Sequence, residues 1–578
     1  MFKNFCSHAY CLVFLGIMGL SVLCTPAYVH AQTVPAPTDI PGSADPGRLD
    51  VDPDTLLPER PPPEIKLPDG SVIKPRAPED AEDITFKLKS VRIDGATAFT
   101  QEQLADIYQP FIGHEIKLSR PWEFAGRITE RYRAEGYFLS RAYISAQEIT
   151  DGEITIEVIE GYIHNVHLQK AGQSTAHKNH LVEKLIGRIT DARPISLKKL
   201  ENSLLLLNDI PGLQFETVIA PDDALPDGAI NLVLLQRETQ GRGNLRVDNH
   251  GSRFTGPFRT AFAYEDSVLP LQKTSLSGIV SVPELNELTA LTLQHEARIL
   301  PRTSLLFSVA KTESRPGFTL SQFDIESQSF SWRVGFVQQI LRQRQQSLDV
   351  GLALDYRDSD TDVLDTVSSR DRIRKVQAKL NYDGRDPFKG VNDFNVTVSQ
   401  GIDGLGANDA GDANLSRPEA KPDFTAFNAR WQRQQFIARD WLLTSTLVGQ
   451  KASGPLLASE EFGFGGPTLG RAYDASEITG DDGIAGSLEV SFTGIKPVWD
   501  FNLTPSVFYD IGKVWNQDAG QPDNTAADAA GLGLRFAHPS GLGGRLSFAL
   551  PLTTSPDTSG LGNNDNEPHL FFQIGQSF

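Results

Sequence analysis

The chain has 578 residues, 39% of them hydrophobic, and a formal net charge of −19 at pH 7. This length allows several domains, and the acidic excess argues against a nucleic-acid partner. All three cysteines lie within the first 24 residues, so disulfides, thiolate metal sites and cysteine nucleophiles are excluded from the rest of the chain.

Residues 1–31 have the pattern of a secretory signal peptide. Lys3 supplies the positive start, residues 12–23 form the apolar core, and residues 29–31 form a small-residue cleavage site. The apolar run is too short for a membrane-spanning helix. Cys24 offers a lipoprotein site as an alternative, which the bulky leucine before it disfavours.

Residues 32–83 are rich in proline and polar side chains, which predicts an extended spacer. Within this linker, residues 43–48 could begin a short helix. The proline and glycine in that stretch weaken the helix.

Two modules of β-α-α-β-β order follow, at residues 84–160 and 161–239. In the first we expect strands at 86–93, 141–149 and 153–159 and helices starting near Thr100 and Ser119. An Asp-Gly pair at 151–152 predicts a hairpin. The second module repeats this order, with helices at 177–186 and 196–208 and a second Asp-Gly pair at 227–228.

Residues 240–578 show strand patterns and no convincing helix. Phe258, Phe262 and Tyr264 share one face of a strand, whereas Arg259 and Glu265 share the other. Such alternation over about ten residues is typical of an outer-membrane barrel. We predict sixteen strands, at 243–250, 256–267, 272–283, 287–299, 302–312, 324–338, 345–358, 371–384, 391–402, 420–436, 438–452, 483–494, 500–511, 528–538, 542–552 and 568–578.

The connections between these strands tend to alternate in length. Short turns are expected near 300–301, 439 and 539–541, and long loops at 313–323, 359–370, 403–419, 453–482, 512–527 and 553–567. Short turns on one side and long loops on the other indicate a transmembrane β-barrel, since only helices and closed barrels satisfy every backbone group in lipid. The alternative, a soluble β-sandwich or propeller, explains neither this asymmetry nor the signal peptide. An even strand count places the two modules in the periplasm.

The glycine-rich stretch 461–486 is the most unusual part of the barrel region. It holds seven glycines and a proline, and a long loop of this kind in a compact domain usually has a function. Arg471 is its only basic residue. On strand 500–511, Asp510 shares the polar, inward-facing parity, where a lone carboxylate would be costly. We therefore predict that the loop folds into the lumen and that Arg471 pairs with Asp510; the alternative is a solvated Arg471 in a surface loop.

Four sequence motifs strengthen this interpretation. They are Glu-Gly-Tyr-Phe-Leu-Ser-Arg-Ala-Tyr-Ile at 135–144, Asp-Asn-His-Gly at 248–251 with Thr-Gly at 255–256, Leu-Gly-Arg-Ala-Tyr at 469–473, and Phe-Tyr-Asp-Ile-Gly-Lys-Val-Trp at 508–515. In these motifs the chain resembles the two-partner secretion transporters (the TpsB class), which export haemolysin- and filamentous-haemagglutinin-type proteins. They belong to the same barrel superfamily as the outer-membrane assembly insertases.

The resemblance implies a Gram-negative outer-membrane location, a linker often carrying a plug helix, two periplasmic POTRA modules and a sixteen-stranded barrel. It assigns a loop–barrel lock to Arg471 and Asp510. The other residues it assigns are the loop tip Gly470, Ala472 and Tyr473, the first-hairpin residues Asp248, Asn249 and Gly251, the strand residues Phe508, Gly512 and Trp515, and the assembly signal Phe578. The family usually has Val-Arg-Gly-Tyr or Val-Arg-Gly-Phe at the tip, so Ala472 departs from its pattern.

The expected function is passive export of an unfolded TpsA-type partner. Its N-terminal secretion domain would bind the POTRA modules, plausibly by adding a strand to a sheet edge, and the chain would pass through the lumen as the Arg471 loop rearranges. Outer-membrane lipid and the assembly machinery, through the C-terminal strand, are further expected partners; no nucleic acid, nucleotide, cofactor or metal is expected.

Three alternatives remain at this stage. An insertase or lipid transporter of the same superfamily is the first, and a diffusion porin, which would lack POTRA modules, is the second. An enzyme is the third, although the sequence has no His-Glu-x-x-His or serine-elbow pattern. The alternating acids at 358–362 could bind calcium, but a solvated loop is the favoured interpretation.

Overall fold

The computed structural model of the chain describes residues 41–49, 53–57, 77–170, 179–220, 226–269, 271–519, 522–553 and 567–578. The predicted signal peptide, its three cysteines and most of the proline-rich linker lie outside the described residues. No described helix is long and apolar enough to span a membrane.

The first module packs helix α3 (Arg120–Ala134) on a three-stranded sheet of order β2-β5-β4. Proline at the start of α3 suits a first helical turn, and Phe124, Ile128 and Tyr132 form its fully buried stripe. The elements around it are β1 (Thr85–Lys87), β2 (Ser90–Asp94), α2 (Gln101–Leu104), β3 (Glu115–Lys117), β4 (Arg141–Tyr143) and β5 (Glu153–Ile159). The predicted strand 141–149 is therefore shorter than expected, because the Gln147 amide takes over pairing with the Thr155 backbone.

The second module repeats the arrangement with a sheet of order β6-β8-β7. Helix α4 begins at an Asn179 cap and α5 at a Ser196 cap, as their side chains accept backbone N–H bonds. Leucines and isoleucines from both helices and all three strands form one core. The elements are β6 (Tyr162–Lys170), α4 (His180–Thr190), α5 (Leu197–Asn208), β7 (Leu213–Ala220) and β8 (Ala229–Glu238).

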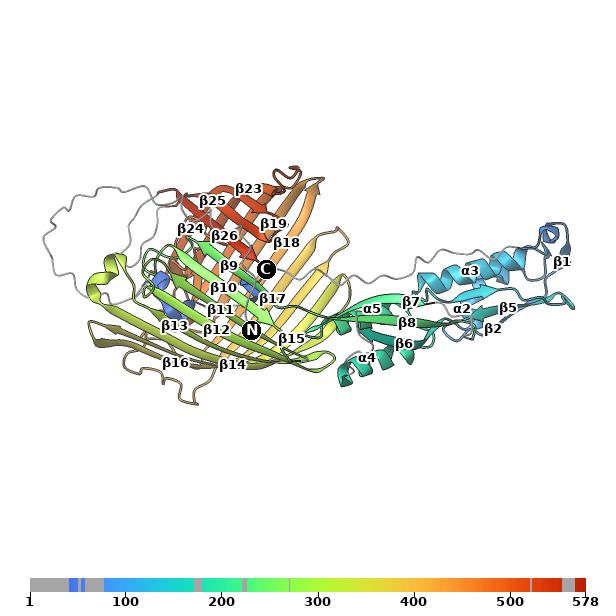
Figure 1. Ribbon diagram of the computed structural model, residues 1–578, viewed down its shortest axis with the longest axis horizontal. Coiled ribbons are helices and arrows are strands. Elements are labelled where there is room, and N and C mark those ends of the chain that lie inside the picture. The colour runs from blue at the N-terminus through green and yellow to red at the C-terminus, as the bar shows by residue number, and fades with distance from the viewer. Residues whose placement is uncertain are drawn as a thin grey trace, which may run out of the picture. The chain divides into compact units, whose positions relative to one another are not determined.

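Sixteen antiparallel strands in the described chain close into a barrel, in which β9 pairs with both β10 and β26 (Figure 1). Every strand overlaps a predicted one. They are β9 (Arg242–Asp248), β10 (Arg259–Asp266), β11 (Gln272–Ser281), β12 (Leu288–Leu300), β13 (Thr303–Ser314), β14 (Ile325–Arg342), β15 (Gln346–Val363), β16 (Thr366–Arg385), β17 (Val391–Gly401), β18 (Thr425–Ala438), β19 (Trp441–Ala452), β22 (Asp482–Phe492), β23 (Asn502–Trp515), β24 (Asn524–Ala537), β25 (Leu542–Pro551) and β26 (His569–Ser577).

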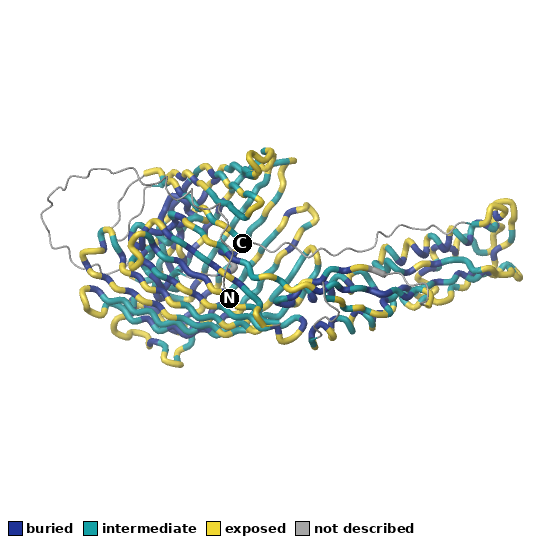
Figure 2. Tube along the Cα trace, viewed as in Figure 1, coloured by how far each residue is buried: buried dark blue, intermediate teal, exposed yellow. Residues whose placement is uncertain are grey.

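Burial alternates along the barrel strands as the period-2 pattern requires (Figure 2). On β23, Val507 and Ile511 are half exposed, whereas Phe508 and Asp510 are buried. The wall therefore has an apolar outer face and a polar lumenal face, as in outer-membrane barrels.

One predicted loop is wrong. Residues 359–370 do not form a long connection, because β15 and β16 continue outward and meet at Leu364 and Asp365. Both residues have positive φ angles, of 49° and 57°, which suits a two-residue hairpin turn. The acids at 358, 360 and 362 are consequently strand residues and not members of a solvated loop.

The lumen is occupied by two segments. One is the lumenal loop, residues 453–481, which carries the short hairpin β20 (Phe462–Phe464) and β21 (Ile478–Gly480). The other is the plug segment, residues 41–49 and 53–57, which holds two 3-10 turns and the single helical turn α1 (Pro53–Leu56). Helix α1 packs on β10 and the second 3-10 turn on β14.

Candidate functional site

The tip of the lumenal loop contacts the barrel wall through Arg471. Its Nε donates to Asp510 Oδ2 at 2.9 Å and its Nη2 to Asp510 Oδ1 at 2.7 Å. The Arg471 backbone N–H also donates to Asp510 Oδ2, at 3.1 Å. Asp510 is fully buried and the Arg471 side chain is 3% exposed. This is the bidentate geometry in which a guanidinium best stabilises a buried carboxylate.

A second carboxylate completes the site. Arg471 Nη1 lies 2.5 Å from Glu489 Oε2, which also accepts from Arg545 Nη2 at 2.7 Å. The guanidinium carbon lies 3.5 Å from the centre of the Phe508 ring, a cation–π contact. Arg471 thus binds side chains from β22 and β23 directly, and Glu489 connects it to Arg545 on β25.

The tip adopts a turn that explains the departure from the family pattern. Gly470 has a φ of +75°, and the Tyr473 N–H donates to its carbonyl at 2.9 Å. The backbone position with positive φ is therefore Gly470, directly before the arginine. Residue 472 does not have a positive φ, so alanine fits there and glycine is not required. Tyr473 is buried and donates to the Asp528 and Thr553 carbonyls.

Gly512 makes room for the loop hairpin. A Cβ atom at Gly512 would lie 2.3 Å from the Phe464 ring, which seats the hairpin directly against β23. Trp515, at the end of the same strand, does not join the site. It has the outward parity and is 37% exposed.

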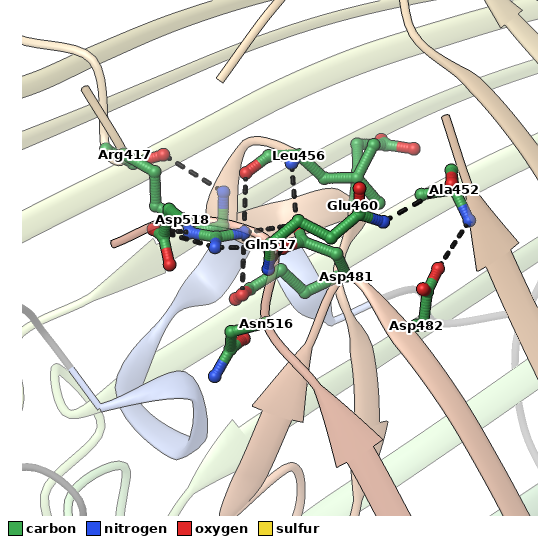
Figure 3. A network of polar contacts seen from close by, with 12 residues as sticks. Arg417, Ala452, Leu456, Glu460, Asp481, Asp482, Asn516, Gln517 and Asp518 are labelled. Carbon is green, nitrogen blue, oxygen red and sulfur yellow. Dashed lines mark hydrogen bonds and ion pairs between the residues drawn. The ribbon is translucent and has the colours of Figure 1, made fainter. Parts of the chain in front are cut away.

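The base of the lumenal loop is attached by a cluster that the sequence did not single out. Arg417, from the connection between β17 and β18, binds Asp481 and Asp518 (Figure 3). It also pairs with Glu461. Its Nη1 lies 2.5 Å from Asp481 Oδ1 and 2.9 Å from the Leu456 carbonyl. The buried Asp481 also accepts the backbone N–H groups of Leu456 and Gln517. Arg417 and Asp518 lie in separate loops, 101 residues apart in the sequence, so no spacing rule could have revealed the cluster.

The plug segment joins the same cluster. Arg48 Nη1 lies 3.2 Å from Glu461 Oε2, and its Nη2 donates to the Glu461 carbonyl at 2.9 Å. Arg357 on β15 donates through Nη1 to the Gly47 carbonyl, and Ser252, in the connection between β9 and β10, donates to the Ser43 carbonyl. Glu461 therefore has one cation from the plug segment and another from an outer loop. The predicted weak helix at 43–48 is present as two 3-10 turns.

The first-hairpin residues lie at the barrel seam. Asp248 is buried and accepts from Arg246 and Arg259 at 3.0 Å. Asn249 bonds with β26 through the Leu570 carbonyl and the Phe572 N–H. Gly251 has no space for a Cβ atom, which would lie 1.8 Å from the Gly256 carbonyl. Within the part of the chain that the structure describes, none of these three residues has a hydrogen bond or ion pair with Arg471 or Arg417.

The last residue extends the same seam. Phe578 pairs with the Gly243 backbone in both directions, at 2.8 and 3.0 Å, and its side chain is 70% exposed. Among the described residues, no cluster of three histidine, cysteine or acidic side chains could hold a metal ion.

Comparison with known proteins agrees with this architecture. The family described as haemolysin secretion/activation protein ShlB/FhaC/HecB matches residues 300–536, and the ShlB-type POTRA domain matches residues 86–161. The chain belongs to this secretion family. It is an outer-membrane transporter of the two-partner secretion class, with POTRA domains in the periplasm.

Individual relatives are distant. The heme/hemopexin transporter protein HuxB of Haemophilus influenzae strain 86-028NP is 23% identical over 83% of this chain and 86% of its own length. The outer membrane transporter CdiB of Dickeya dadantii is 20% identical over 77% and 79%. The solved structure of CdiB from Escherichia coli has a TM-score of 0.70 at 17% identity, covering 88% of this chain and 93% of that one. At this identity the structural likeness shows a shared fold.

Proposed function

We propose that this chain exports an unfolded partner protein through its own barrel and that the lumenal loop and the plug segment together close the lumen at rest. Passage then requires both segments to rearrange. The observation that supports this most directly is the placement of Glu461 between Arg48 and Arg417, because it connects the two obstructing segments in one buried charge cluster.

The tip and the base have different roles in this proposal. The Arg471–Asp510 pair acts as a loop–barrel lock, which keeps the tip in register with the wall. The Arg417 cluster holds the base and the plug segment closed. Opening of the base exposes the lumen while the tip defines the position to which the loop returns.

The exported protein is recognised at the POTRA domains, and its folding outside the cell supplies the work. The two relatives bear different names, one being a heme/hemopexin transporter and the other an outer membrane transporter. At 20–23% identity neither name specifies the cargo of this chain. The apolar outer face contacts outer-membrane lipid. The assembly machinery recognises the C-terminal strand, which ends at Phe578.

The decisive experiment deletes this chain and measures surface release of the exoprotein encoded beside it. Loss of release, restored by the native chain, is the expected result. Levels of unrelated barrel proteins in the outer membrane are measured in the same cells, since an insertase would lower them. Unchanged release, or a general loss of barrel proteins, would contradict the proposal.

A further inference from the structure

Strands β14, β15 and β16 are longer than a membrane crossing requires. They have 18, 18 and 20 residues, whereas about ten suffice to span the apolar layer. The second POTRA module precedes β9, so odd-numbered strands from β9 to β15 run away from the periplasm. The turn at 364–365 therefore lies on the extracellular side, and the extra length extends outward.

The outer face of these strands changes from apolar to ionic at one level. In the described register, Val309, Trp332, Tyr356 and Arg374 lie side by side in one outward-facing cross-strand row. On the periplasmic side of this row the outer face carries exposed apolar side chains, which are Val334, Phe336 and Leu352.

On the extracellular side of that row six of the eight side chains are charged, the exceptions being Phe330 and Gln328. The next two rows hold Lys311, Phe330, Asp358 and Arg372, and then Glu313, Gln328, Asp360 and Arg370. The stacked Trp332–Tyr356 pair marks the boundary, with ring centres 5.2 Å apart and planes inclined by 12°. Aromatic rings concentrate where the apolar layer of a membrane meets the head groups, so the ionic rows lie at head-group level.

The ionic rows form a ladder between β15 and β16. Arg372 Nη1 lies 2.7 Å from Asp360 Oδ1, and Arg370 Nη2 lies 2.8 Å from Asp362 Oδ1. The Arg370 and Arg372 side chains remain 31% and 29% exposed. Guanidinium groups bind phosphate in the same forked geometry as carboxylate, so a phosphate group can replace or share a carboxylate at this surface.

We propose that the outward ladder of Arg370 and Arg372 on β16 binds the phosphate groups of a phosphorylated lipid in the outer leaflet, whose acyl chains lie on the apolar rows below. The chemistry it recognises is a phosphate monoester, and the occupant is the lipopolysaccharide that faces an outer-membrane barrel on this side. The site belongs to the lipid-facing wall and does not depend on the gating proposed for the lumen.

The test uses the purified full chain in detergent and the temperature at which its barrel unfolds. Added rough-type lipopolysaccharide is expected to raise this temperature. In the double variant Arg370→Gln/Arg372→Gln, the lipid concentration that gives half of the rise should increase at least about fivefold, as each basic group near a charged membrane surface contributes about a factor of five.

Lys451→Gln is the matched control. Lys451 is an outward cation at the extracellular end of β19, paired with Asp482 and 73% exposed. It lies outside the ladder, so its loss should change the lipid concentration needed by much less than the double variant does. An equal response in the double variant would overturn the proposal. So would an equal rise with dephosphorylated lipid, which would show acyl binding only, or with inorganic phosphate, which would show a free anion site.

A second variant protects against failure of the double variant to fold. Asp360→Asn removes the carboxylate that both arginines approach, and it is expected to lower the lipid concentration needed. An unchanged or higher requirement in this variant would contradict phosphate binding by the ladder.

Discussion

The lumenal loop is attached at its tip and at its base, and the two attachments differ in the elements that carry the partner carboxylates. At the tip, Arg471 binds Asp510 and Glu489, which belong to strands of the closed wall. At the base, Arg417 binds Asp481, Asp518 and Glu461, which belong to connections outside the strands.

This difference determines how each attachment can release. Strand carboxylates cannot turn away from one another when their cation leaves, so opening the tip leaves buried charge uncompensated. Loop carboxylates can move together with their backbone, and Asp481 keeps two backbone N–H bonds when the cation leaves. The base is therefore the element suited to open, and the tip the element suited to hold register.

The largest effect is expected from fixing the base to the plug segment. A Cβ atom at Gly47 would lie 3.0 Å from Ser459 Cβ, and a shift of about 0.5 Å would bring the pair into the ~3.5–4.5 Å range of disulfides. Gly47→Cys with Ser459→Cys should therefore cross-link and abolish exoprotein release, and a reductant should restore it. Each single cysteine variant is the control and should release normally. Full release by a chain shown to be cross-linked would mean that the plug segment need not leave the loop.

A smaller but strong effect is expected at the tip. Arg471→Ala and Asp510→Ala each leave a buried charge unpaired, at a cost of about 3–5 kcal/mol, and should reduce release sharply while the barrel still assembles. Heat-modifiable migration on gels measures assembly, and surface exoprotein measures release. The double variant should be no worse than either single one. Normal export by both single variants would refute the loop–barrel lock.

The smallest effect is expected from Arg417→Gln. Asp481 keeps two backbone N–H bonds when the cation is removed, so we expect the closed position of the loop to lose about 1–3 kcal/mol. This loss should appear as a higher single-channel conductance with release retained. Lys451→Gln is the control. It removes the ion pair between the exposed Lys451 and Asp482, next to the cluster, and should not change conductance.

The same comparison can be sharpened with Arg48→Gln. Arg48 and Arg417 share Glu461, so the conductance effects of the two variants should not be additive. Ser252→Ala removes a plug contact away from the cluster, and its effect should add to that of Arg417→Gln. Additivity in both pairs would show that Glu461 does not couple the plug segment to the loop.

Periodicity was sufficient to predict the barrel. Because side chains alternate with a period of two, the inward position of Asp510 and the outward position of Tyr509 follow from sequence parity alone. Strand ends were less predictable. The charged residues at 358–362 have a composition typical of loops, but they lie on β15 and pair with arginines on the neighbouring strand β16. Their strand conformation depends on a partner that lies next to them only after the hairpin has formed.

The sequence by itself determined the order of modules, the number of strands and the two faces of the wall. It also identified Arg471 as the loop cation and Asp510 as its carboxylate partner on a strand. Tertiary structure decided which connections enter the lumen and which side chains meet there. Arg48, Arg417 and Glu461 come from three separate segments, and no local pattern relates them. Short-range preferences act between near neighbours along the chain, whereas contacts inside a closed cylinder are set by its closure.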